Sequence, residues 1–314
     1  MVAYFRAQME EREAFFDPGW RHRLISWVRD IDVVGVRFLS GLLPHLLLPA
    51  PKRPMRIRTL HGFDLWIDPV ADRGVERSIY GTGTYEKGTL HFMQHMLLGG
   101  GTFVDIGANI GLMTVLAAHV VGPEGRVVAF EPNPSARAIL SRNVELNGLG
   151  NVEVSAHAIG AEATRARIYE GVGSNRGRAT LMGAGADTTV AEVEVIRMSD
   201  YFNATERVDM VKIDIEGFEL DALKGMDALW KRVSPPMLIV EFSGMRRNSH
   251  AEGVDPIHRY LSGLGVYRFF KGRAGKERVS RLVAIESPVD LPAHDNVYCL
   301  TAEHVAQARK AGLL

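Results

Sequence analysis

The stretch Thr102-Phe-Val-Asp-Ile-Gly-Ala-Asn-Ile-Gly111 decides the fold class of this chain. Its apolar residues predict a buried strand that runs into a glycine-containing turn and then into a helix. A second stretch, Val127-Val-Ala-Phe-Glu-Pro132, predicts the next strand, which stops at the acidic residue Glu131. A strand–turn–helix unit followed by a strand with an acidic end is typical of a site for a nucleoside cofactor, because a carboxylate there binds the ribose hydroxyls.

Strands alternate with helical segments from residue 101 onward, which predicts a parallel α/β sheet with helices on both faces. The expected strands are Phe103–Ile106, Val127–Phe130, Val152–Ala156, Met210–Ile215, Met237–Phe242, Tyr267–Phe270 and Asn296–Thr301. The expected helices are Leu112–Val120, Ser135–Asn147, Phe218–Trp230 and Ala302–Ala311. Two further strands, Ala166–Glu170 and Val193–Met198, interrupt the alternation around a glycine-rich segment. The chain thus predicts a doubly wound sheet with one insertion.

Composition narrows the classes of partner. The 314 residues contain 37 basic and 37 acidic side chains, so the net charge is zero and the basic excess typical of nucleic-acid-binding proteins is missing. A single cysteine, Cys299, excludes an intrachain disulfide and fits a reducing compartment. The first residues are too charged for a secretory signal. We therefore expect a cytoplasmic protein that acts on a small molecule and does not bind nucleic acid.

The residues ahead of the alternating region predict two further units. We expect a helical extension over residues 1–55, a hairpin and helix over 56–98 around His61-Gly62, and the main domain over 99–314. The most apolar run, Phe38–Leu48, is about half the ~20 residues of a membrane span, so no transmembrane segment is expected. That run leaves open a contact with a membrane surface, and the apolar extension makes a homodimer reasonable.

The turn after the first strand favours S-adenosylmethionine over a dinucleotide. Gly107 and Gly111 lack side chains that would obstruct a ligand, and a helix with free N–H groups starts near Ile110. A dinucleotide site would need Gly-x-Gly-x-x-Gly, whereas this chain has Gly107-Ala-Asn-Ile-Gly111. Asp105 ahead of the turn suits the ammonium of the methionine part and is ill placed for a pyrophosphate.

Two strand ends complete the predicted cofactor site. Glu131 is expected to accept both ribose hydroxyls, although it could also serve as a favourable charge at the N-terminus of the helix that follows Pro134. The end of the third strand, Ser155-Ala-His-Ala158, is expected to border the adenine ring. His157 and Ala158 are therefore candidate contacts, with an ordinary packed or solvated role as the alternative for His157.

A second group of charges follows the fourth strand. Strand alternation places Lys212, Asp214 and Glu216 on one side, near the carboxyl end where open α/β sheets bind ligands. Glu241 ends the next strand and is expected to face the same crevice. Lys212 could simply neutralise Asp214 or Glu216 as an ion pair. Otherwise Asp214, Glu216 and Glu241 orient the cofactor and the acceptor, or hold a Mg²⁺ ion.

Taken together, these motifs resemble the FkbM family of class I S-adenosylmethionine-dependent methyltransferases over about residues 80–245. The motifs are Tyr85-Glu86, Val104-Asp-Ile-Gly-Ala-Asn-Ile-Gly111, Phe130-Glu-Pro132, Asn151-Val152 with Ala158-Ile-Gly160, Lys212-Ile-Asp-Ile-Glu-Gly-Phe-Glu219 with Leu223-Lys-Gly225, and Ile239-Val-Glu241. The resemblance implies a seven-stranded sheet with an antiparallel last strand, and methyl transfer to a hydroxyl of a sugar, polyketide or other small metabolite.

The resemblance also implies roles for individual residues. Cofactor contacts would come from Glu86, Asp105, Gly107, Asn109, Gly111, Glu131 and Pro132, and Asp214, Glu216 and Glu241 would line the reaction centre. An alcohol must lose a proton during attack, and the candidate bases are those three carboxylates and His250, with His61 as an outsider. Residues 171–189, with Arg176 and Arg178, and Arg246-Arg247 are candidate acceptor contacts.

Three alternatives remain open. The acceptor atom could be a nitrogen of a small molecule or peptide. A nucleic-acid methyltransferase on this fold often carries an Asn/Asp-Pro-Pro-Tyr/Phe turn after the fourth strand, where this chain has Asp214-Ile-Glu-Gly217. A non-catalytic cofactor-binding protein would have no need of the charged crevice.

Overall fold

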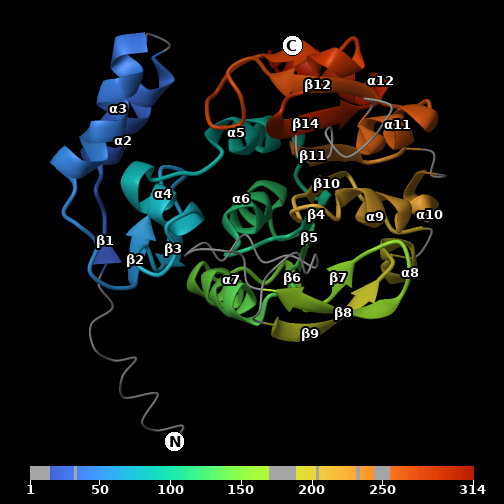
Figure 1. Ribbon diagram of the computed structural model, residues 1–314, viewed down its shortest axis with the longest axis horizontal. Coiled ribbons are helices and arrows are strands. Elements are labelled where there is room, and N and C mark those ends of the chain that lie inside the picture. Colours follow the sequence, from blue (N-terminus) through green and yellow to red (C-terminus); the bar gives the residue numbers. More distant parts are fainter. Residues whose placement is uncertain (1–14, 32–33, 170–188, 203–204, 231–233, 244–254) are drawn as a thin grey trace, which may run out of the picture.

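The computed structural model describes residues 15–31, 34–169, 189–202, 205–230, 234–243 and 255–314. An eight-stranded sheet lies at the centre of the molecule (Figure 1). Its strands, in spatial order, are β13 (Leu282–Ala284), β12 (Arg268–Gly272), β14 (His294–Leu300), β11 (Met237–Ser243), β10 (Met210–Ile213), β4 (Thr102–Ile106), β5 (Arg126–Phe130) and β6 (Val152–Ser155).

The strand directions confirm the expected fold class. Strands β11, β10, β4, β5 and β6 are parallel to one another, and β14 runs antiparallel to both of its neighbours, β11 and β12. The short strand β13 pairs with β12 at the edge and makes the sheet one strand wider than the seven implied by the resemblance. All parallel strands therefore present their carboxyl ends at one edge, where Asp105, Glu131, Asp214 and Glu241 lie at or just beyond the strand ends.

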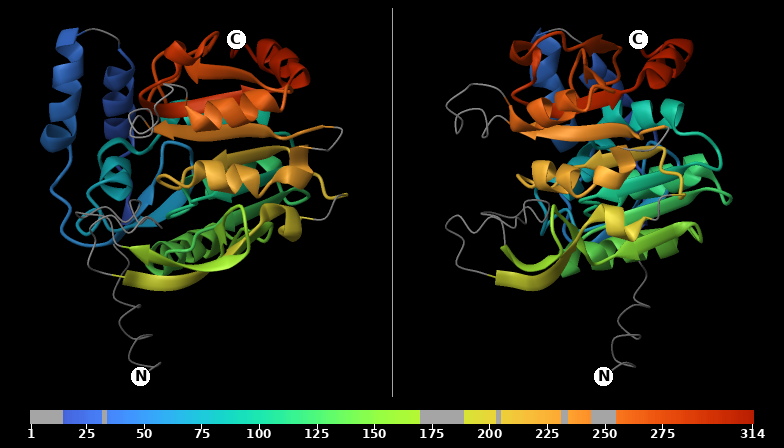
Figure 2. Two further views of the ribbon diagram at one scale, coloured as in Figure 1. Left: turned by 45° about the vertical axis from the view of Figure 1, so that its right-hand side comes forward. Right: turned by 90° about the vertical axis from the view of Figure 1, so that its right-hand side faces the viewer.

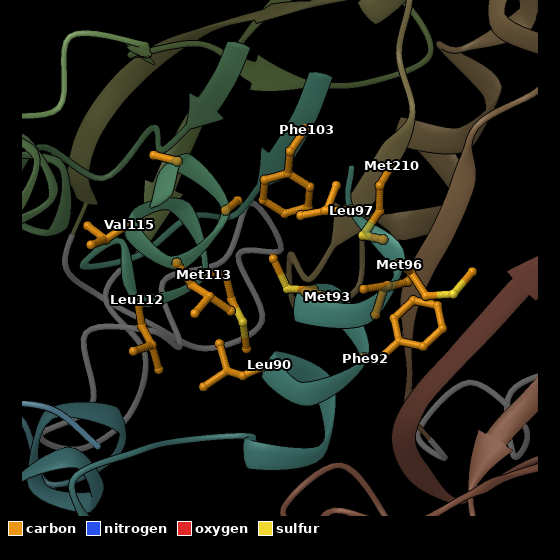
Figure 3. Packing of buried hydrophobic residues seen from close by; sticks show 14 of the residues in the cluster. Leu90, Phe92, Met93, Met96, Leu97, Phe103, Leu112, Met113, Val115 and Met210 are labelled. Carbon is orange, nitrogen blue, oxygen red and sulfur yellow. The ribbon is translucent and has the colours of Figure 1, made fainter. Parts of the chain in front are cut away.

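Helices cover both faces of the sheet (Figure 2). Alternating strand residues divide the apolar core between the two faces, because successive side chains of a strand point to opposite sides. Phe103 and Met210 pack with α5 (Lys87–Met96) and α6 (Leu112–Val121), as Figure 3 shows. Val104 and Val211 pack on the other face with α8 (Met198–Tyr201), α9 (Glu219–Lys224) and α11 (Pro256–Gly263).

Two expected elements end earlier than the sequence suggested. Strand β10 stops at Ile213, so Asp214 and Ile215 lie in the turn that follows, and Glu216 has a left-handed backbone with φ 46°. Strand alternation therefore does not place Glu216 beside Asp214. The single helix expected over Phe218–Trp230 is two helices, α9 and α10 (Asp227–Trp230), because the first ends at Gly225.

The insertion after β6 forms a small sheet of its own. Its three strands are β7 (Ala158–Ile159), β9 (Thr189–Ile196) and β8 (Thr164–Tyr169). The two strands expected here are present, although the second ends at Ile196 and Met198 begins α8. Thus Ala158 is a buried residue of this sheet.

The N-terminal part lies beside the main sheet (Figure 1). Its elements are β1 (Phe15–Phe16), α2 (Trp20–Asp30), α3 (Val34–Leu47), β2 (Met55–Arg58), β3 (Asp64–Ile67) and α4 (Val75–Thr82). The expected hairpin around His61-Gly62 is the β2–β3 pair. It docks on α7 (Pro134–Leu146), where buried Asn143 accepts the Trp66 N–H at 2.6 Å and donates to the Ile110 carbonyl at 2.8 Å. None of the helices in the described ranges has the length and apolarity of a membrane span.

Candidate active site

The turn after β4 is shaped by its contacts with the rest of the protein. Gly107 has φ 83°, and a Cβ atom there would lie 2.0 Å from the backbone oxygen of Asp214. Gly111 has φ 89° and caps the N-terminus of α6. Between them, Asn109 also has a left-handed backbone, with φ 51°. The glycine at 107 is therefore required by the close approach of the segment that follows β10.

Asp105 lies beneath this turn and is almost fully buried. Its Oδ2 accepts a hydrogen bond from the Thr114 hydroxyl at 2.6 Å, whereas Oδ1 has no hydrogen-bond partner among the described residues. Asn109 Oδ1 is likewise buried and unpartnered within the described ranges. Burial raises the pKa of Asp105, and Lys212 partly opposes that effect. Within the described ranges, these two buried oxygens at one turn are therefore acceptors that no protein donor satisfies.

Glu131 connects the end of β5 to the same turn. Its Oε2 accepts the Asn109 N–H at 2.7 Å and its Oε1 accepts the Asn133 N–H at 2.8 Å. Burial raises the pKa of Glu131 to about 7, even though both N–H groups favour the ionised form. Each oxygen retains a further lone pair for a hydroxyl. Asn133 caps α7 by accepting the Ser135 N–H at 3.0 Å, and Glu131 lies next to this cap as the negative charge expected near the N-terminus of the helix.

The carboxylates predicted at the next strand ends are paired with lysines. Lys212 Nζ lies 2.8 Å from Asp214 Oδ2, so the anticipated ion pair does form. Lys276 Nζ lies 2.7 Å from Glu241 Oε1 and 2.8 Å from Glu86 Oε1. The structure thus brings Glu86, Asp214 and Glu241 together around the ammonium groups of Lys212 and Lys276, and we call these five residues the carboxylate–lysine cluster.

Asp214 and Glu241 have opposite protonation preferences. A hydrogen bond joins their side chains. Burial and then the charge of Asp214 raise the pKa of Glu241. Burial acts in the same direction on Asp214, but Lys212 and Lys276 outweigh it and hold the pKa of that carboxyl far below its usual range. These opposite shifts favour a protonated Glu241 beside an ionised Asp214.

Comparison with known families identifies the family of this chain. The Methyltransferase FkbM domain model matches residues 105–269, which is more than half of the chain. The chain belongs to the FkbM methyltransferase family.

Two curated fungal relatives match part of the chain. Methyltransferase sdnD of Sordaria araneosa is 30% identical over 155 residues, which cover 40% of this chain and 60% of that protein. Methyltransferase 1 of Beauveria bassiana (strain ARSEF 2860) is 29% identical over 147 residues, covering 40% of this chain and 57% of that protein. The chain thus spans under two thirds of the length of the curated relatives it matches.

The comparison with solved structures gives matches with low TM-scores. A putative rRNA-methylase from Clostridium thermocellum has a TM-score of 0.42 at 14% identity, covering 68% of this chain and 92% of that one. The O-methyltransferase TomG from Streptomyces achromogenes, solved with S-adenosylmethionine, has a TM-score of 0.40 at 15% identity, covering 68% and 78%.

S-adenosylmethionine is the cofactor of this FkbM domain, and the residues present fit it. Glu131 is a buried carboxylate with lone pairs for the two ribose hydroxyls. Asp105 and Asn109 carry the unpartnered oxygens, which suit the N–H donors of the methionine ammonium. The carboxylate–lysine cluster lies at the neighbouring strand ends. The other cofactor contacts assigned from the sequence remain predictions.

The predicted Mg²⁺ ligands Asp214 and Glu241 contact lysine ammonium groups in this FkbM domain. Across the part of the chain that the structure describes, no three histidine, cysteine, aspartate or glutamate side chains form a metal-binding group. A magnesium ion at this site stays a prediction that no contact here supports.

The structure describes two of the three candidate histidines. His157 Nδ1 lies 2.9 Å from the Ser155 hydroxyl and its Nε2 lies 3.6 Å from Glu194, at the rim of the small sheet. His61 Nε2 lies 2.8 Å from the Thr84 hydroxyl, and burial lowers the pKa of His61 to about 4. His250 lies outside the described residues, as do residues 171–188 and Arg246-Arg247.

Lys276 is the member of the cluster that sequence reasoning missed. It lies in the loop between β12 and β13, beyond the motifs of the family resemblance. Asn296 was also missed, and its Nδ2 donates to Glu86 Oε2 at 2.8 Å. The glycines of Gly272-Arg-Ala-Gly-Lys276 indicate a turn between two strands, but β13 has only three residues and gives little periodicity.

Proposed function

We propose that this protein transfers the methyl group of S-adenosylmethionine to a hydroxyl of a small-molecule acceptor. The observation that carries the proposal is the arrangement of carboxylates at four adjacent strand ends. Asp105 and Glu131 lie at the ends of β4 and β5, Asp214 directly follows β10, and Glu241 lies in the last part of β11. The first pair suits the cofactor, and the second pair is available to the acceptor.

The chain's residues would bind the cofactor, orient it toward the acceptor and remove the hydroxyl proton of the acceptor. When bound, S-adenosylmethionine supplies an electrophilic methyl group on a sulfonium. Glu131 would hold the ribose, and the β4 turn would hold the methionine part, which fixes the direction of approach. The Asp214–Glu241 pair would accept the hydroxyl proton of the acceptor once the pair has lost its shared proton. Turnover is therefore expected to rise with pH as Glu241 ionises.

Cofactor binding tests the proposal directly. Titration calorimetry with S-adenosylhomocysteine should show one site in the wild-type protein. Glu131→Ala removes the ribose acceptor and should weaken binding at least about tenfold, or about 1.4 kcal/mol. Glu153→Ala is the matched control, because Glu153 is an exposed residue of the neighbouring strand β6 that pairs with Arg126. No binding by a folded wild-type protein would refute the proposal.

The acceptor can be identified by its product. Incubation with candidate hydroxylated metabolites and S-adenosylmethionine should give one product heavier by a single methyl group in mass spectrometry. Fragmentation assigns the methyl group to oxygen or to nitrogen. A methylated amine or nucleic acid as the sole product would replace the hydroxyl acceptor proposed here.

A further inference from the structure

The loop that carries Lys276 is anchored at both backbone groups of that residue. The Gly88 N–H, in the first turn of α5, donates to the Lys276 carbonyl at 2.8 Å. The Lys276 N–H donates to Asp295 Oδ1 at 2.9 Å. A Cβ atom at residue 88 would lie 2.5 Å from the Arg278 carbonyl oxygen, so a glycine there permits the close packing. The main chain around Lys276 is therefore fixed by α5 and β14.

The side chain of Lys276 connects two distant parts of the chain. Its Nζ contacts Glu86, which precedes α5, and Glu241, which lies in β11. The exposed fractions of the three side chains are 10% for Lys276, 1% for Glu86 and 5% for Glu241. Removing Lys276 would leave the two buried carboxylates without its positive charge, which is strongly destabilising. The ammonium group therefore constrains the positions of both Glu86 and Glu241.

Other groups also face the two carboxylates. Glu86 accepts from Asn296 Nδ2, and its backbone N–H donates to Glu277. Glu241 is linked to Asp214, and His294 Nε2 lies 3.6 Å from its Oε1. Further titratable groups near these carboxylates are Lys212, Asp105, Asp295 and Tyr85. Within the part of the chain that the structure describes, Lys276 forms ion pairs with both Glu86 and Glu241.

We propose that Lys276 is a positioning residue for methyl transfer, whose ammonium holds Glu86 and Glu241 at one point and thereby directs Glu241 toward Asp214. The role in methyl transfer rests on the proposed function, but the coupling itself belongs to the ligand-free protein. Loss of the ammonium would leave Glu86 and Glu241 facing each other without a cation between them. Glu241 would then hold its proton to a higher pH.

Carboxyl NMR of ligand-free protein labelled with [δ-¹³C]glutamate tests this coupling. The Glu241 resonance is assigned by its absence in Glu241→Gln. We expect its titration midpoint to rise by at least about one pH unit in Lys276→Gln, a tenfold change in the acid dissociation constant. Lys276→Arg retains the charge and should stay near the wild-type midpoint. An unchanged midpoint in folded Lys276→Gln would overturn the proposal.

A measurement on the wild-type protein covers the case in which Lys276→Gln does not fold. The ¹⁵Nζ resonance of Lys276, assigned by its absence in Lys276→Arg, should shift with pH at the same midpoint as Glu241. A lysine signal that ignores the titration of Glu241 would contradict the coupling. Both measurements are made without cofactor, so their failure is distinguishable from a failure of S-adenosylhomocysteine to bind.

Discussion

At the scale of single residues, Glu241 shows how two carboxyl groups are accommodated in one buried place. Lys212 and Lys276 stabilise the negative charge of Asp214, whereas burial and the charge of Asp214 favour the neutral form of Glu241. Glu241 Oε1 accepts a hydrogen bond from Lys276 Nζ at 2.7 Å. A glutamine side chain offers the same donor and acceptor without the ionisation.

Glu241→Gln is therefore expected to change the pH dependence of stability. Burial and Asp214 raise the pKa of Glu241 from 4.5 to about 8 in the folded protein. Between these values the folded state binds a proton that the unfolded state has lost, so the free energy of unfolding falls as the pH rises from 4.5 to 8. Glu241→Gln should lack this part of the decline, as urea denaturation at pH 5, 6.5 and 8 would show.

The control for this prediction is Glu153→Gln. Glu153 is half exposed, and its hydrogen bond with Arg126 lowers its pKa in the folded protein, so its own contribution to the pH dependence of stability is confined to the acid end of the range. The control should follow the wild-type slope. Equal slopes for wild type and Glu241→Gln would show that Glu241 is ionised in the folded protein at neutral pH.

At the scale of elements, the packing of the Lys276 loop on α5 depends on a glycine in a helix. Alanine normally stabilises a helix relative to glycine by up to about 1 kcal/mol. At Gly88 the added methyl group would meet two backbone carbonyl oxygens, of Arg278 at 2.5 Å and of Lys276 at 2.9 Å. Backbone atoms cannot turn aside as a flexible side chain does, so the loop would have to move.

Gly88→Ala and Gly41→Ala should consequently have opposite effects on stability. Gly41 lies in α3, is exposed, and has nothing within 4 Å of an added Cβ atom. We expect Gly41→Ala to raise the free energy of unfolding by about 0.5–1 kcal/mol and Gly88→Ala to lower it by about 1–3 kcal/mol. Thermal and urea denaturation measure both. A stabilised Gly88→Ala would mean that the loop does not pack on α5 as described.

The elements that could be predicted from the sequence are those with a local signal. Strands β4, β5 and β11 are apolar runs. Each has one acidic residue near its carboxyl end, which made Asp105, Glu131 and Glu241 recognisable as candidate site residues. The early end of β10 has no such signal, because Asp214-Ile-Glu alternates as a strand would. Strand β10 ends early because the backbone of Asp214 turns and packs directly against Gly107. Lys276 was missed for a related reason, since only the packing of its loop on α5 and β14 brings it to Glu241.

At the scale of the whole molecule, the N-terminal helix α2 is tied to the segment that carries Glu86. Lys87 contacts Asp30 and donates to the Ser26 hydroxyl at 2.8 Å. His22 is buried, and its Nε2 lies 2.8 Å from the Tyr80 carbonyl, so the ring donates from Nε2. Arg29 of the same helix is close enough to Glu277 to favour its ionised form.

Acid is expected to loosen α2 before the sheet. Burial lowers the pKa of His22 from 6.5 to about 4. Between these values the detached helix binds a proton that the docked helix does not, so docking weakens as the pH falls from 6.5 toward 4. Hydrogen exchange, corrected for intrinsic rates, should show faster exchange of α2 amides at pH 5 than at pH 7.5. Amides of β4 and β10 serve as the internal reference, and equal protection of α2 at both values would contradict the prediction.

The position of Glu86 has a consequence for chimaeras between members of this family. Glu86 precedes the matched domain, which begins at residue 105, yet it shares Lys276 with Glu241. Joining residues 99–314 to the leading segment of a relative would exchange one of the three acids around that lysine. The acids around Lys276 in such a hybrid would then come from two different sequences, and its leading segment would need a glutamate ahead of α5 to keep both ion pairs of Lys276.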